Sequence, residues 1–242
     1  MVHPLEGQVA LVTGASSGIG EGIAGALGTC GVRLGLVGRR LEALGLVSRD
    51  IGSASPSVKS YAIDLSDEAA VRVLAQNVQQ DFGGVDILIH CAGVFVRERI
   101  DATSAAAFDH QYRINLRAPH SLTRELASSL RARRGQVVFI NSSVARGAQA
   151  GLSHYAATKA ALKALADALR EEFNADGVRV LSVFVGRTAT PMQEAIFKQE
   201  GRAYDPDRLL QPADIAAVVI SCLSLPRTAE VTEIDVRPMM RV

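Results

Sequence analysis

Short apolar runs alternate with longer amphipathic stretches along the whole chain. The runs are rich in Val, Ile and Leu and predict strands over residues 8–12, 32–37, 58–63, 87–91, 136–141, 179–185 and 231–236. The stretches between them have helical periodicity and predict helices over 18–29, 40–51, 67–82, 103–133, 154–175 and 212–224. Continuously apolar strands that alternate with helices indicate a parallel sheet covered on both faces. We therefore expect an α/β fold with a seven-stranded parallel sheet, in one domain over residues 1–242, because no linker or repeat interrupts the alternation.

Polar and glycine-containing segments follow the carboxyl ends of the first six predicted strands. In open α/β sheets these ends lie at one edge, and ligands bind outside them. The segments, in strand order, are Thr13 to Gly20, Gly38 to Arg40, Asp64 and Leu65, Ala92 and Gly93, Asn141 to Ser143, and Gly186 to Thr190. Their shared position predicts a ligand site along that edge.

The first of these segments, Thr13 to Gly20 (TGASSGIG), lies between an apolar strand and a helical pattern. Glycines allow the backbone to turn tightly and to approach a pyrophosphate, whose charge then lies at the helix N-terminus. An ordinary Gly/Ser loop without a ligand is the alternative. The position directly after the first strand favours the phosphate-binding interpretation.

Tyr155 directly precedes a run over 156–171 that is predicted to be helical, and Lys159 follows it by four residues. This spacing puts both side chains on one face of a helix. A tyrosine ordinarily titrates near pH ~10, and an adjacent ammonium group stabilises the phenolate and lowers that pKa. The pair is therefore a candidate general acid/base, although the same spacing also occurs on solvated helix faces.

Composition and charge narrow the class of protein. The formal net charge is +1 at pH 7, which gives no reason to expect a nucleic-acid partner or a polybasic membrane surface. Cys30, Cys91 and Cys222 are far apart and odd in number, which favours free thiols in a reducing compartment. Cys and His residues show no metal-ligand spacing, so we expect no metal, and we expect a soluble cytoplasmic protein.

Together these motifs resemble the short-chain dehydrogenase/reductase family, and the resemblance extends over essentially the whole chain. The T-G-x-x-x-G-x-G turn corresponds to Thr13 to Gly20, and the Y-x-x-x-K element corresponds to Tyr155 to Lys159. The resemblance implies a Rossmann-type doubly wound fold. It also implies an oxidoreductase that transfers hydride between a nicotinamide cofactor and a carbonyl or secondary alcohol substrate.

The resemblance also assigns roles to four residues. Tyr155 would exchange the substrate proton, Lys159 would lower its pKa and hold the nicotinamide ribose, and Ser142 would hydrogen-bond the substrate oxygen. Asn115 would hold a water that relays protons; the alternative is a polar residue that satisfies a helix irregularity. Ser142 lies thirteen residues before Tyr155 and seven after a glycine that opens a strand, as is common in the family, whereas the double serine itself favours Ser143. A cap of a turn is the other interpretation of Ser142.

The cofactor site implied by the resemblance draws on every polar segment of the edge. Its expected residues are Gly14, Ser16, Ser17, Gly18, Ile19, Gly20, Arg39, Arg40, Asp64, Leu65, Ala92, Gly93, Asn115, Tyr155, Lys159, Gly186, Thr188 and Thr190. Two family signatures are altered: N-N-A-G is represented by the segment from His90 to Gly93, and P-G by Val185 and Gly186. Loss of the proline is expected to make that turn less rigid.

Charge after the second strand predicts the choice of cofactor. An NAD-dependent enzyme usually has an acidic residue there that binds the ribose hydroxyls. This chain has Gly38 followed by Arg39 and Arg40, and guanidinium groups bind a 2′-phosphate where a carboxylate would repel it. We expect NADP(H) rather than NAD(H), with Arg39 as the main contact and Arg40 as a secondary one; two solvated arginines are the alternative. Asp64 either meets the adenine edge or caps the next helix.

Two segments are expected to set substrate specificity. These are residues 145–154 and 187–211, and in the second we expect an apolar lid formed by Met192, Ile196, Phe197 and Tyr204. His154 is either a substrate ligand or a solvent-facing residue. By resemblance, the helices near 103–133 and 154–175 would form a homodimer or homotetramer. A non-catalytic NADP(H)-binding sensor or scaffold of the same fold is the competing function.

Overall fold

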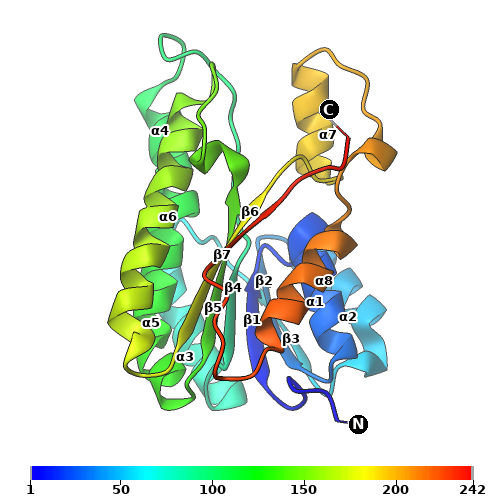
Figure 1. Ribbon diagram of the computed structural model, residues 1–242, viewed down its shortest axis with the longest axis vertical. Helices are drawn as coiled ribbons and strands as arrows, with labels where there is room; N and C mark the ends of the chain where they lie inside the picture. The colour runs from blue at the N-terminus through cyan, green and yellow to red at the C-terminus, as the bar shows by residue number, and fades with distance from the viewer. Residues whose placement is uncertain (1, 241–242) are drawn as a thin grey trace.

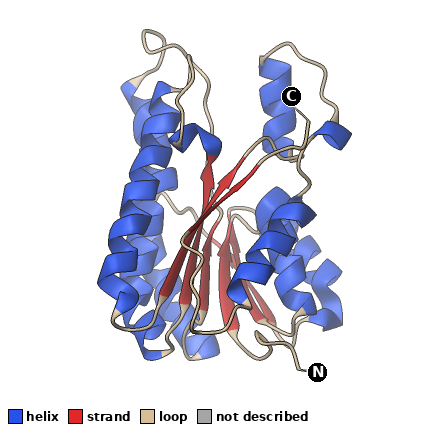
Figure 2. Ribbon diagram, in the orientation of Figure 1, coloured by secondary structure: helices blue, strands red, loops and turns tan. Residues whose placement is uncertain are grey.

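Seven parallel strands form the centre of the molecule, in the order β3-β2-β1-β4-β5-β6-β7 (Figure 2). The computed structural model describes residues 2–240. The strands are β1 (Val9–Thr13), β2 (Arg33–Gly38), β3 (Val58–Ala62), β4 (Ile87–His90), β5 (Gln136–Ser142), β6 (Arg179–Val185) and β7 (Glu233–Val236). Each pairs in parallel with its neighbour, so all the carboxyl ends lie at one edge. The predicted fold class is confirmed, and the predicted strands are recovered with ends that differ by one or two residues.

Helices cover both faces of this sheet (Figure 1). One face is covered by α1 (Gly18–Thr29), α2 (Leu41–Ile51) and α8 (Pro212–Leu223). The other is covered by α3 (Glu68–Phe82), α5 (Ala118–Ala132) and α6 (Ser153–Asn174), with α4 (Ala105–Tyr112) preceding α5. A further helix, α7 (Pro191–Gln199), stands beyond the carboxyl ends of the strands. Within residues 2–240, none of the helices has the length and apolar character needed to span a membrane.

Each face of the sheet has its own apolar core. Ile23 and Leu27 of α1 pack with Val12 of β1 on one face, and Leu122 of α5 and Phe139 of β5 pack together on the other. These side chains are almost fully excluded from solvent. Burial on both sides explains why the central strands are continuously apolar rather than alternating, as the sequence indicates. The cores hold the strand ends rigidly and so position the residues that follow them.

The predicted helix over 103–133 is interrupted. Residues Arg113–Arg117 form a π-helical turn between α4 and α5, in which Asn115 is buried. An extra residue per turn shifts the side chains on this short stretch relative to a regular α-helix. The sequence pattern does not reveal this irregularity, because apolar periodicity continues on both sides of it.

The segment over 187–211, expected as a long loop, contains helix α7. Thr190 caps its N-terminus by accepting a hydrogen bond from the Gln193 N–H at 3.2 Å, and Pro191 occupies its first turn. Both residues are favourable at a helix start. The helix is therefore encoded locally, and its polar composition made it hard to distinguish from a loop.

Candidate active site

A cavity of about 440 Å³ lies at the carboxyl ends of the strands, between the glycine-rich turn and α7. Most of the predicted site residues line it. They are Gly14, Ser16, Ser17, Gly18, Ile19, Gly20, Arg39, Leu65, Ala92, Gly93, Ser142, Tyr155, Lys159, Gly186, Thr188 and Thr190. Three predicted residues, Arg40, Asp64 and Asn115, are not part of the lining. The structure thus brings the predicted segments together at one edge.

The glycine-rich turn leaves space for a ligand at the start of α1. Gly14 and Gly18 have φ angles of +69° and +58°, in the left-handed region that favours glycine. A Cβ on Gly14 would lie 2.8 Å from backbone atoms of Ala92, so the turn packs directly on the segment after β4. Ser17 precedes α1 and makes no side-chain capping bond. The first N–H groups of this helix therefore remain available, as the pyrophosphate of a dinucleotide requires.

The residues after β2 and β3 lie at one end of the cavity. Both arginines are exposed; Arg39 lines the cavity, whereas Arg40, which precedes α2, lies outside the lining. Asp64 is exposed and accepts a hydrogen bond from the Ser66 N–H at 2.8 Å, and Asp67 is the residue that caps α3. Asp64 therefore does not cap the next helix, which was one of its two expected roles; Asp67 does so instead. Leu65 supplies the apolar surface at this position.

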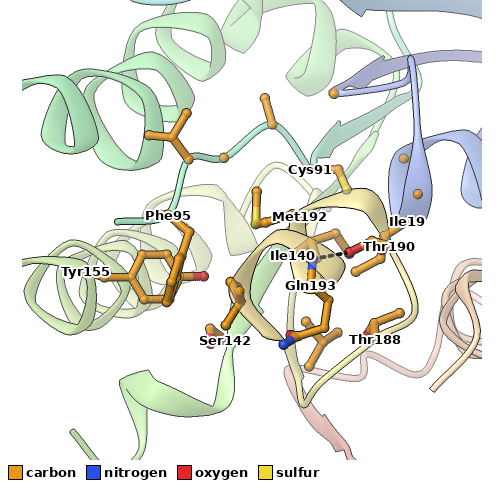
Figure 3. Close-up of a pocket in the computed structure, with 18 of the residues that line it drawn as sticks. Ile19, Cys91, Phe95, Ile140, Ser142, Tyr155, Thr188, Thr190, Met192 and Gln193 are labelled. Carbon is orange, nitrogen blue, oxygen red and sulfur yellow. Dashed lines mark hydrogen bonds between the residues drawn. The ribbon is translucent and has the colours of Figure 1, made fainter. Parts of the chain in front are cut away.

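Tyr155 lies beside Ser142 and Phe95 within the cavity (Figure 3). The Phe95 ring packs edge-on against the Tyr155 ring, with centroids 4.9 Å apart. Burial raises the pKa of Tyr155 to about 12, and the Ser142 side chain, within hydrogen-bonding reach, opposes this rise. The lowering of this pKa that was expected from Lys159 is not found, because burial has the largest effect and Ser142 supplies the only opposing one.

Lys159 is buried behind the tyrosine. Its Nζ donates to the Ile140 carbonyl oxygen at 3.1 Å and lies 5.9 Å from the centroid of the Tyr155 ring. Burial lowers the pKa of Lys159 to about 8. Asn141 Nδ2 donates to the Lys159 carbonyl oxygen at 3.1 Å and so ties α6 to the end of β5. The lysine is held in place by the two strand-end residues rather than by an anion.

The two adjacent serines differ in exposure. Ser142, the last residue of β5, is 9% exposed and lies beside Tyr155, whereas Ser143 is exposed. The Ser142 hydroxyl also accepts a hydrogen bond from the Val144 N–H at 3.4 Å, so it caps the short turn that follows. Both interpretations of Ser142 from the sequence are therefore compatible with its position, and the geometry favours it over Ser143.

Asn115 is 1% exposed and lies behind the cavity wall. Its Oδ1 accepts from the Val94 N–H at 2.9 Å, and its Nδ2 donates to the Val94 carbonyl at 3.0 Å and to the Thr158 hydroxyl at 3.2 Å. These bonds join the π-helical turn, the segment after β4 and α6. These partners lie outside the π-helical turn itself, so the Asn115 side chain cross-links neighbouring segments rather than satisfying the backbone of the irregular turn.

Comparison with known proteins identifies the family. The sequence matches the family model described as short chain dehydrogenase over residues 8–201. The chain belongs to the short-chain dehydrogenase family. A glycine betaine reductase of Emericella nidulans is 34% identical over 97% of this chain, although the chain spans only 19% of that relative's length. An uncharacterized oxidoreductase of Staphylococcus aureus is 32% identical, with 97% of this chain and 99% of the relative covered.

Solved structures of short-chain dehydrogenases are similar over the whole fold. A metagenomic short-chain oxidoreductase in complex with NADP has a TM-score of 0.85 and 32% identity, covering 98% of this chain and 100% of its own. L-sorbose reductase from Gluconobacter frateurii, complexed with NADPH and L-sorbose, has a TM-score of 0.90 and 26% identity, covering 98% and 97%. A similar 3-ketoacyl-(acyl-carrier-protein) reductase from Brucella melitensis is complexed with NADH.

The altered N-N-A-G signature retains a hydrogen-bonded structure. His90 is 3% exposed, its Nε2 lies 2.8 Å from the Thr123 hydroxyl, and its ring stacks on Phe139 at 4.9 Å. Burial lowers the pKa of His90 to about 3, so the ring is neutral. The backbone N–H groups of Cys91 and Ala92 donate to the Thr13 hydroxyl at 3.1 and 3.2 Å. His90 and Thr13 therefore stabilise this segment in the absence of the two asparagines of the N-N-A-G signature.

Several residues of this site were not predicted from the sequence. Phe95, Arg97 and Glu200 line the cavity, and Arg97 reaches Glu200 across more than a hundred residues of sequence, a contact that no local pattern predicts. His154 is buried rather than solvent-facing and lies outside the cavity lining; its Nε2 lies 3.1 Å from the Val96 carbonyl oxygen, which ties α6 to the segment after β4.

The lid expected over 187–211 is only partly apolar. Ile196 and Phe197 are buried, Met192 is 43% exposed, and Tyr204 packs edge-on against Phe197 at 5.6 Å. The guanidinium groups of Arg187 and Arg202 lie over the Phe197 ring, 4.9 and 5.1 Å from its centroid. The segment thus combines an apolar core with charged residues that face the cavity.

Proposed function

We propose that this short-chain dehydrogenase is an NADP(H)-dependent oxidoreductase that transfers hydride between the nicotinamide and a carbonyl or secondary alcohol substrate. One observation carries the proposal: the Tyr155 phenol, the Ser142 hydroxyl and the Lys159 ammonium converge in the same cavity as the glycine-rich turn. A sensor or scaffold would have no need of a half-buried phenol, a hydroxyl donor and a buried cation at that position. The catalytic interpretation is therefore preferred over the non-catalytic one.

Tyr155 acts as the general acid when a carbonyl is reduced. A pKa raised to about 12 by burial keeps the phenol protonated over the physiological range, so it can donate its proton to the carbonyl oxygen. NADPH, held at the glycine-rich turn and Arg39, would supply the hydride for the carbonyl carbon. Ser142 donates a hydrogen bond to the same oxygen as negative charge develops on it. In the oxidation direction Tyr155 must first lose its proton, so that direction is expected to speed up as pH rises.

Arg39 supports the choice of NADP(H). It lines the end of the cavity after β2, and the nearby Asp64 carboxylate, whose pKa Arg39 helps to lower, lies outside the lining. Its guanidinium group is suited to a 2′-phosphate. The similar structures that contain NADP or NADPH agree with this choice, although one similar protein contains NADH. Arg40, exposed and outside the lining, would contribute as a secondary contact.

Asn115 acts by positioning. It binds both backbone groups of Val94, next to Phe95, whose ring contacts Tyr155. The same side chain bonds to Thr158, adjacent to Lys159. We propose that it aligns the two catalytic side chains. A proton relay through a water held there would use its remaining hydrogen-bonding capacity.

The assembly and location follow the family expectation. We propose a homodimer or homotetramer, assembled through the outer faces of α5 and α6, in the cytoplasm. Light scattering coupled to size-exclusion chromatography gives the mass directly, and a monomer over the working concentration range would contradict this assembly.

The proposed activity is tested by consumption of NADPH, followed by its absorbance, with a panel of ketones, aldehydes and secondary alcohols. Parallel reactions contain NADH, and binding of each cofactor is measured by fluorescence titration. We expect turnover of at least one carbonyl class and a preference for NADPH. Tight NADPH binding without turnover across the panel would instead support the sensor or scaffold.

A further inference from the structure

The lining of the cavity carries an excess of positive charge. Among the described residues that line the cavity, Glu200 is the only acidic one, whereas four are basic. These are Arg39, Arg97, Lys159 and Arg187. Arg39 lies at the end proposed for the 2′-phosphate, and Lys159 lies behind Tyr155. Arg97 and Arg187 have no part in the mechanism proposed above.

Arg97 and Arg187 meet at Glu200. Arg97 Nη1 lies 2.6 Å from Glu200 Oε1, and Arg187 Nη2 lies 2.7 Å from Oε1 and 3.0 Å from Oε2. Arg202 Nη1 lies 3.4 Å from Oε2 but is not part of the cavity lining. The carboxylate side chain is 9% exposed. Three guanidinium groups therefore surround one carboxylate, and one negative charge neutralises only one of them.

Two donors in this part of the cavity lack a partner. Arg187 Nη1 and Gln193 Nε2 are buried and make no hydrogen bond among the described residues. Both belong to residues that line the cavity, and Gln193 extends toward Ser142 in Figure 3. A buried N–H without an acceptor is costly, so such groups indicate a missing acceptor. Both atoms are donors, so the missing partners are hydrogen-bond acceptors, such as the oxygen atoms of a ligand.

Arg97 lies on the substrate side of Tyr155 rather than on the cofactor side. It follows Phe95, which contacts Tyr155, by two residues, and the next residue, Glu98, donates its N–H to the Gly151 carbonyl at 3.0 Å. Gly151 belongs to the segment between Ser142 and Tyr155 that was expected to contact substrate. The phosphates of a dinucleotide would instead bind at the glycine-rich turn and at Arg39, at the other end of the cavity.

We propose that the substrate of this enzyme carries a carboxylate, held by Arg97 and Arg187 at the α7 end of the cavity while its carbonyl or hydroxyl group meets Tyr155. The substrate class is then an oxo acid or the corresponding hydroxy acid. This assignment rests on the proposed oxidoreductase function. Guanidinium groups bind carboxylates in a planar, two-bonded geometry that a hydroxyl of a neutral sugar cannot reproduce.

Matched pairs of acids and esters test the proposal. The probes are 4-formylbenzoate and 4-oxopentanoate, each compared with its methyl ester, with saturating NADPH and wild-type enzyme. We expect kcat/KM to favour the acids by about tenfold or more, a ratio typical of one charge-assisted contact. In Arg97→Gln the KM of each acid should rise by a similar factor, while its kcat and both parameters of the ester change by less than about twofold.

Arg202→Gln is the matched control, because it removes the same charge from the same carboxylate but lies outside the lining. It should retain the preference for acids. Esters turned over as well as acids, or equal losses for both in Arg97→Gln, would overturn the proposal. So would a rise in the KM of NADPH with an unchanged acid-to-ester ratio, which would assign Arg97 to the cofactor.

A binding measurement separates this proposal from the proposed activity. Thermal shift and calorimetry with the NADP⁺ complex report whether each acid or ester binds, whether or not it is turned over. Acids that bind, with binding lost in Arg97→Gln, would support the carboxylate site even if no carbonyl were reduced. Failure of both acids to bind the wild-type complex would overturn it even if neutral carbonyls were reduced.

Discussion

Replacing Lys159 by methionine removes a buried ammonium group while retaining most of its aliphatic length. Burial lowers the pKa of this lysine from an ordinary value of 10.5 to about 8. The difference of about 2.5 corresponds to about 3 kcal/mol at about 1.36 kcal/mol per pKa unit. Loss of the hydrogen bond from Nζ to the Ile140 carbonyl offsets about 1 kcal/mol of this. At pH 7 we therefore expect Lys159→Met to be more stable than wild type by about 2 kcal/mol, although inactive.

The stability difference between Lys159→Met and wild type should change with pH in a defined direction. Below pH 8 Lys159 is charged in both the folded and the unfolded protein, so the full cost of burying it is present. Between pH 8 and 10.5 the folded protein loses this proton first, and this residue's contribution to wild-type stability rises. The stability advantage of Lys159→Met should therefore shrink as pH increases from 7 to about 9.5.

Urea unfolding followed by far-ultraviolet circular dichroism is the assay, since the chain has no tryptophan. Lys163→Met is the control, because Lys163 lies one turn further along α6 and its bonds with Asp167 and Glu233 raise its pKa. That variant should be slightly less stable than wild type. A Lys159→Met protein that is less stable than wild type at pH 7, or whose advantage does not change with pH, would refute the reasoning.

Two further pairs of neighbouring residues give matched predictions. Ser142→Ala should lower kcat by about 10²-fold or more with little change in NADPH binding, whereas Ser143→Ala should change it by less than about threefold; equal effects in steady-state assays would contradict the assignment of Ser142. Arg39→Ala should reduce the NADPH-to-NADH ratio of kcat/KM by about tenfold to a hundredfold, and Arg40→Ala by much less. An unchanged cofactor ratio in Arg39→Ala would place the 2′-phosphate elsewhere.

The sheet and most of the ligand site could be predicted from the sequence because local patterns encode them. Continuous apolar runs such as that over residues 9–12 identify strands that are buried on both faces. The glycine turn carries the backbone freedom that its positive φ angles require. Since all the strands are parallel, the positions of the polar segments after them follow from topology alone.

Features that depend on long-range packing could not be predicted. The π-helical turn at Asn115 is stabilised by bonds to Val94, which is far away in sequence. The contact of Arg97 with Glu200 joins the segment after β4 to the end of α7. The pKa of Tyr155 is set by how deeply the ring is buried, which the spacing of Tyr155 and Lys159 does not reveal. In each case the decisive partner comes from another element of the fold.

The central claim, that Tyr155 is the proton donor of a reductase, is tested most directly by Tyr155→Phe. This change removes one hydroxyl oxygen and retains the ring that packs against Phe95. With NADPH and a carbonyl substrate of the wild type, the account predicts that kcat falls by about 10²- to 10⁴-fold while NADPH affinity stays within about threefold of wild type. The conservative variant Tyr112→Phe, at an exposed site on α4, should retain full activity. A Tyr155→Phe enzyme with near-wild-type kcat would contradict the account.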